Sequence, residues 1–209
     1  MSLVMRTALV VGACAIVAVV TAGCGDTANI AASSADPTSG LASPSASASA
    51  CANPQLSSST SPVTRLALTV SGIPFGGPPL KQITDGEMNN TPNSDQRGFA
   101  NATNTYRIED DVVLDPSALN ASADYPQLRD AAKKQFVSVT SVSSLGHLGC
   151  QADEFIGKTL TGYSQVGVAL QDGDVIAVVL VVNSAAPVDP AFAAAVALAQ
   201  DQKIAGAAA

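Results

Sequence analysis

The stretch "TLTGYSQVGVALQDGDVIAVVLVV", residues 159–182, decides the fold class of this chain. Its first half alternates apolar and polar residues, as a half-buried strand does. Asp172-Gly173 lies at the point where a tight hairpin turn needs a positive φ. The run 175–182 is then apolar on both faces, which is typical of a central strand. The pattern therefore predicts an antiparallel hairpin whose second strand lies inside a sheet that is covered on both sides.

The end of the chain predicts a helix. Asp189 is a suitable N-cap, Pro190 fits the first turn, and "FAAAVALAQDQKI" at 192–204 is rich in helix formers. Gly206 then predicts where the helix stops. We expect the apolar side of this helix to pack on the sheet.

The middle of the chain predicts a second helix and several more strands. Asp124 and Pro126 indicate a helix start, and the helix is expected to run to about Phe136. Asp153-Glu154 is interpreted as a surface-facing helix start, and the Gly- and Pro-rich residues 72–98 as a long irregular loop. Alternation predicts strands at 64–71, 99–108, 112–114 and 137–142. The expected fold class is α+β, a mostly antiparallel sheet with two or so helices packed on a face.

The first 24 residues predict an export signal. Residues 1–6 end in Arg6, and residues 7–20 form an uncharged apolar run. A membrane span needs roughly 20 residues, so this run is too short for one and has the length of a signal-peptide core. Thr21-Ala22-Gly23-Cys24 resembles the bacterial lipobox. The resemblance implies cleavage after residue 23, a lipid on Cys24, and attachment to the outer face of the cell membrane.

Residues 24–50 differ sharply in composition from the rest of the chain. Small and polar residues dominate them, above all Ser and Ala, and they show no apolar period. Such a segment cannot bury enough surface to offset the entropy of ordering it, so we expect a disordered tether. The predicted organisation is a signal peptide at 1–23, the lipidated cysteine and tether at 24–50, an extracytoplasmic domain at 51–206 and a tail at 207–209.

The cysteines fit this placement. Of the four, Cys14 leaves with the signal and Cys24 takes the lipid, which leaves Cys51 and Cys150. An even number of cysteines outside the cytosol predicts a disulfide. It would close a loop of about 100 residues, worth roughly 4 to 5 kcal/mol in the chain-entropy model. Two free thiols, or a metal pair of Cys150 with His147, are the alternatives.

Charge and motifs narrow the function classes. The net charge of −7 without a basic stripe argues against nucleic acid as a partner and against docking on anionic lipid. The only histidine is His147, in a turn-rich link, and no Gly-x-Ser-x-Gly motif is present. Glu109-Asp110-Asp111 could pair carboxylates or bind Ca²⁺, but such a run is more typical of a solvated turn. We assign no catalytic residue, metal or cofactor. Phe75 and Tyr163 are the candidate ligand contacts.

Taken with the lipobox and tether, the run "LGHLGCQADEFIG…GVALQDGDVIAVVLVV…DPAFAAAVALAQDQKI" within 145–204 resembles actinobacterial cell-envelope lipoproteins. These families resemble the Mog1/PsbP-like sandwich and the extracellular sensor domains of receptor kinases. The resemblance implies location and fold more than activity. The expected function is non-catalytic binding or sensing of an envelope protein or lipid. The alternatives are a carrier with an apolar cavity of several hundred Å³ and a hydrolase that uses paired carboxylates.

Overall fold

The computed structural model describes residues 62–77, 79–88 and 91–208. The predicted leader, the lipidated Cys24, the tether and Cys51 lie outside the described residues, so the expectations placed on them stay predictions.

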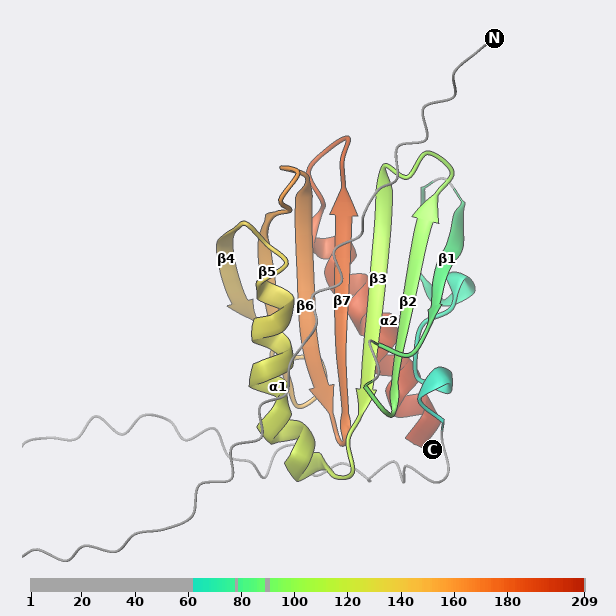
Figure 1. The fold of residues 1–209 in the computed structure, drawn as a ribbon, viewed down its shortest axis with the longest axis vertical. Helices are drawn as coiled ribbons and strands as arrows, with labels where there is room; N and C mark the ends of the chain where they lie inside the picture. The colour runs from blue at the N-terminus through green and yellow to red at the C-terminus, as the bar shows by residue number, and fades with distance from the viewer. Residues whose placement is uncertain (1–61, 78, 89–90, 209) are drawn as a thin grey trace, which may run out of the picture. The chain divides into compact units, whose positions relative to one another are not determined.

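The described residues form one seven-stranded antiparallel sheet with two α-helices, which confirms the α+β class (Figure 1). The strand order is β1-β2-β3-β7-β6-β5-β4, so the last strand of the chain lies in the middle. The strands are β1 Leu80–Gly86, β2 Ser94–Asn101, β3 Tyr106–Leu114, β4 Ser138–Ser144, β5 Gln151–Lys158, β6 Ser164–Asp172 and β7 Val175–Asn183.

The predicted central hairpin is confirmed. Asp172 of β6 pairs with Val175 of β7, and Gly173 between them has a φ of 57°. A two-residue hairpin needs such a positive φ, which glycine adopts without a steric penalty. From Val175 to Val181 every side chain of β7 is buried. The strand is therefore covered on both faces, as its continuous apolar run predicted.

The two helices lie on opposite faces of the sheet, which agrees with the covering of the central strand on both sides that its apolar run predicted. Helix α1, Ala118–Lys133, packs against β6 and β7 on one side, and α2, Pro190–Ala208, packs against the same strands on the other (Figure 1). The reason is the double-sided burial of β7. Ile176 and Leu180 pack beneath α1, while Val179 and Val181 belong to the cluster beneath α2.

The expected helix start at Asp124 was wrong, because α1 begins about two turns earlier. Ser117 is the N-cap, and its Oγ accepts the backbone N–H of Asn120 at 3.2 Å. Pro126 therefore lies inside the helix, where it removes one hydrogen bond. The burial of Ala121 and Tyr125, at 0% and 2% exposure, offsets that loss.

The expected N-cap of α2 is confirmed. Asp189 Oδ1 accepts the N–H of Ala191 at 3.0 Å. The helix continues through Gly206 to Ala208, so the predicted stop was two residues early.

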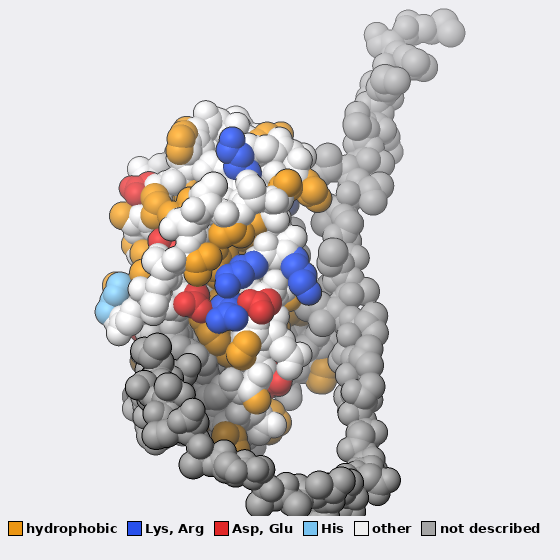
Figure 2. All heavy atoms as spheres, turned by 90° about the vertical axis from the view of Figure 1, so that its left-hand side faces the viewer, with side chains coloured by type: hydrophobic (Ala, Val, Ile, Leu, Met, Phe, Trp, Pro, Cys, Tyr) orange, Lys and Arg blue, Asp and Glu red, His pale blue; other side chains and the backbone are white. Residues whose placement is uncertain are grey.

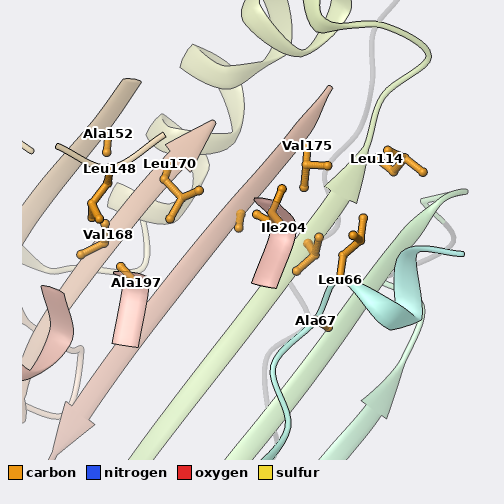
Figure 3. Close-up of a cluster of buried hydrophobic side chains, with 12 residues drawn as sticks. Leu66, Ala67, Leu114, Leu148, Ala152, Val168, Leu170, Val175, Ala197 and Ile204 are labelled. Carbon is orange, nitrogen blue, oxygen red and sulfur yellow. The ribbon is translucent and has the colours of Figure 1, made fainter. Parts of the chain in front are cut away.

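The predicted strand at 64–71 was also wrong. Residues 62–73, which we call the strap, form two short 3₁₀ turns, Val63–Arg65 and Val70–Gly72, and do not pair with the sheet. Leu66, Ala67 and Leu68 between the turns are at most 1% exposed. Figure 3 shows Leu66 and Ala67 in the same cluster as Leu114 of β3 and Ile204 of α2. The strap and α2 thus cover one face of the sheet together.

Residues 72–98 are not one long loop. They contain all of β1 and the first half of β2. Six of the seven residues of β1 are exposed, so the strand carries no apolar alternation from which it could be predicted. The region expected as a strand at 99–108 is the end of β2, a turn and the start of β3.

Candidate functional site

The acids Glu109-Asp110-Asp111 are not a solvated turn, because they lie within β3. Neighbouring residues of a strand point to opposite faces. Asp110 is 0% exposed beneath the strap, while Glu109 and Asp111 face the other side of the sheet. The two adjacent aspartates therefore cannot converge on one substrate, as the hydrolase alternative would need of them.

Asp110 instead belongs to a set of buried polar side chains that bind the backbone of the strap. Its Oδ2 accepts the N–H of Leu68 at 2.7 Å. Arg97 donates to the carbonyl oxygens of Thr64 and Leu68, each at 2.7 Å, and Gln200 of α2 donates to that of Leu66 at 2.8 Å. These contacts satisfy backbone groups that have no strand partner. These hydrogen bonds to the strap account for the burial of Asp110, Arg97 and Gln200.

Burial shapes the acidity of this cluster. Loss of solvation raises the pKa of Asp110 to about 7, although the Leu68 N–H and the nearby Arg97 act in the opposite direction. Arg97 also forms ion pairs with Asp95 at 3.0 Å and with Asp85 at 3.4 Å. Burial nevertheless raises the pKa of Asp95.

On the opposite face, Asp111 lies beside Glu109. The pKa of Asp111 is raised to about 7, mainly because the carboxyl is buried. The hydrogen bond from Gln96 at 2.9 Å acts in the opposite direction, and the negative charge of Glu109 adds to the rise. Just after the end of β3, the pKa of Asp115 is raised to about 6. Burial is the largest cause, and the negative charges of Asp124 and Asp174 add to it. In the described part of the chain, no group of three or more His, Cys, Asp or Glu side chains is arranged to hold a metal ion.

Phe75 and Tyr163, the two candidate ligand contacts, lie in different settings. The Phe75 ring contacts those of Tyr106 and Phe192, with centroids 5.0 and 5.5 Å away. Phe75 also lines a shallow groove of about 190 Å³, whose walls are Val70, Ile73, Gly77, Pro79 and Leu80. Tyr163 is 44% exposed in the loop between β5 and β6. This groove is smaller than the several hundred Å³ that the carrier alternative requires.

The predicted turn-rich link carries His147 and Cys150 between β4 and β5. The Cys150 Sγ lies 3.2 Å from the carbonyl oxygen of Gln171. Because Cys51 is outside the described residues, their pairing stays a prediction.

Asp153-Glu154 does not start a helix, since both residues lie in β5. Asp153 accepts hydrogen bonds from Tyr125 at 3.3 Å and Arg129 at 3.2 Å, which tie β5 to α1. Glu154 faces the other side and accepts from Ser143 of β4 at 3.3 Å.

The outer edge of β4 is an exposed strand edge of the described domain. All seven residues of this strand are exposed, and no strand in the described chain pairs with its outer side. Val137, Val139 and Val142 are 60%, 39% and 53% exposed. Figure 2 views the molecule from this side and shows apolar side chains interspersed with basic and acidic ones. We call β4 with Val137 the β4 edge.

The hydrogen-bonding groups of the β4 edge can be assigned from the ladder. Leu145 donates its N–H to the carbonyl of Ala152, just beyond the pairing of Ser144 with Asp153. Because hydrogen-bonded and non-bonded pairs alternate in an antiparallel ladder, the N–H and C=O groups of Val142 and Ser144 point away from β5. They form a row that an additional strand can bind.

The sequence predicted the strand at 137–142 but not its place at the edge. The local signal was weak: the run "VSVTSVSS" at 137–144 is β-branched and polar, without the continuous apolar character of β7. That pattern indicates limited burial. Which strand ends a sheet depends on pairings between distant segments, which the local pattern does not carry.

These features define an α+β domain in which a seven-stranded antiparallel sheet lies between two helices, with the β4 edge unpaired among the described residues. No helix of the described chain has the length and apolar character needed to cross a membrane. No protein-family model matches the sequence, and no curated protein or solved structure matches it.

Proposed function

We propose that this chain is a lipid-anchored, extracytoplasmic binding module of the bacterial cell envelope, without catalytic activity. The anchor is Cys24, and the folded domain binds an extended segment of an envelope protein along the β4 edge. The lipobox-like Thr21-Ala22-Gly23-Cys24 supports the anchor, and the exposed strand supports the mode of binding.

The single observation that carries the binding mode is the exposed β4 edge, whose outer side pairs with no strand among the described residues. Proteins usually protect such edges with charges, prolines, bulges or a covering segment. The strand has one irregularity, between Val139 and Ser141, but no charged residue and no proline. By contrast, the opposite edge strand β1 carries Lys81 and Asp85.

Strand addition gives this surface a defined chemistry. The outward backbone groups of Val142 and Ser144 supply hydrogen bonds that any extended peptide can make. The exposed valines supply contacts that favour β-branched or aromatic residues on the added strand. Such binding requires no preformed cavity.

Site-specific photo-crosslinking tests this proposal. A photoreactive benzoylphenylalanine replaces Val142 in one strain, and Ile83 of β1, which is 48% exposed, in a matched control strain. We expect a discrete adduct with an envelope protein from position 142 and none from position 83. Equal adducts from both positions, or none from either, would reject binding at the β4 edge.

The anchor is tested separately by Cys24→Ala. The variant should leave the membrane fraction and appear in the soluble exported fraction, because the lipid can no longer be attached. Retention of the variant in the membrane fraction would contradict the anchor.

A further inference from the structure

Basic residues lie near one end of the β4 edge. Lys158 of β5 pairs with Ser138 at the start of β4, and its carbonyl accepts the N–H of Val137. Helix α1 ends immediately before this point, which places Lys133 and Lys134 nearby in the chain. Figure 2 shows Lys and Arg side chains, with acidic ones between them, among the apolar side chains on this side of the molecule.

Of the basic residues near β4, Lys134 and Lys158 are available to a partner, whereas Lys133 and Arg129 already contact other side chains. Lys133 lies 3.7 Å from Asp130, and its Nζ is 5.9 Å from the centre of the Phe155 ring. Arg129 is bound to Asp130 and Asp153. Lys134 and Lys158 are exposed, and neither forms an ion pair within the described residues.

From this arrangement we infer that the β4 edge selects an extended polypeptide segment that carries acidic side chains next to β-branched ones. The inference rests on the proposed function, because it names the chemistry of the segment that the edge binds. The valines and outward backbone groups fit the strand itself. Lys134 and Lys158 then fit carboxylates at the end of that strand which lies beside Ser138.

The charge pattern is distinctive because the chain as a whole is acidic, with a net charge of −7. Its general field disfavours an acidic partner, so attraction must come from the local basic groups. A second copy of the chain is a poorer fit, because its own β4 carries no acid. The nearest acids, Asp153 and Glu154, already accept hydrogen bonds from Arg129 and Ser143.

Two synthetic peptides test the selection: acetyl-Glu-Val-Thr-Val-Thr-Val-Glu-amide and the same peptide with both Glu replaced by Lys. Each carries a fluorophore, and binding to the mature protein is followed by anisotropy at 50 and 300 mM NaCl. We expect the acidic peptide to bind about tenfold more tightly at 50 mM salt. The preference should shrink at 300 mM, because salt screens exposed charges.

The charge-reversal variant Lys134→Glu/Lys158→Glu should bind the basic peptide in preference. The control Arg65→Glu/Lys81→Glu makes the same change in net charge at exposed residues away from β4 and should keep the wild-type preference. Both variants alter only exposed side chains, and circular dichroism confirms that they fold.

The possible failures can be told apart. If both peptides bind equally and Ser144→Pro, which removes an outward N–H, weakens both, strand addition stands and the acidic selection is wrong. If neither peptide binds, both proposals are overturned. A wild-type dimer in sedimentation that Ser144→Pro dissociates would make a second copy the occupant. Binding to phosphatidylglycerol vesicles that depends on Lys134 and Lys158, without binding of either peptide, would identify a membrane as the partner. The dimer result and the vesicle result would each overturn the inference.

Discussion

Asp110→Asn should reduce the pH dependence of the domain's stability. Asp110 is fully buried, and its pKa is raised to about 7 mainly by loss of solvation. In the unfolded chain the pKa of an aspartate is about 3.9. Between these two values the folded protein binds more protons than the unfolded chain. The free energy of unfolding therefore falls as the pH rises from about 4 to about 7.

The size of this effect follows from the two pKa values. Each pKa unit corresponds to about 1.4 kcal/mol, so Asp110 alone lowers the free energy of unfolding by up to about 4 kcal/mol between pH 4 and pH 8. Asparagine keeps an oxygen that can accept the Leu68 N–H but carries no charge to desolvate. The variant should lose that part of the pH dependence and keep the part that Asp111 and Asp115 contribute.

Urea unfolding of the purified protein at several values between pH 4 and pH 8 measures this directly. Asp130→Asn is the control, because the pKa of this exposed carboxyl is lowered by its hydrogen bond from Arg129. The control should not flatten the decline in stability with rising pH. If the free energy of unfolding of Asp110→Asn declines with pH as steeply as that of the wild type, the inference that burial beneath the strap raises the pKa of Asp110 is wrong.

Three smaller predictions concern packing and capping. Gly167→Ala should lower the free energy of unfolding by about 1 to 3 kcal/mol, because the new methyl group would collide with the Phe155 ring and Leu180. In the control Gly76→Ala the methyl group meets nothing within 4 Å, so the midpoint of urea unfolding should not change. Ser117→Ala should cost about 1 kcal/mol through loss of the α1 cap, seen as a drop of about 3 °C in Tm. An unchanged Tm would show that the cap contributes nothing. Gln200→Leu should cost about 1 to 3 kcal/mol by leaving the Leu66 carbonyl unpaired, and a neutral result in urea would reject that anchoring contact.

Elements marked by strong local signals were predictable. The Asp172-Gly173 turn and the apolar run of β7 defined the central hairpin, and Asp189-Pro190 defined the start of α2. In each case the local backbone preference and the burial pattern agree, so tertiary contacts reinforce the local preference.

Other elements depended on contacts between distant segments. The strap alternates like a strand, but Arg97, Asp110 and Gln200, far along the chain, bind its backbone instead. Pro126 indicates a helix start, yet the burial of Tyr125 holds the helix on both sides of it. The β4 edge was hidden for the same reason, because the place of a strand in a sheet follows from pairings that no local window contains.

Amide hydrogen exchange by NMR tests strand addition at the β4 edge most directly. The amides of the mature protein are followed with and without the acidic peptide. Val142 and Ser144, whose N–H groups point outward, should become protected when the peptide binds, while Ser143, which already faces β5, should change little. Peptide binding without protection at Val142 and Ser144, or with protection confined to other strands, would contradict strand addition at this edge.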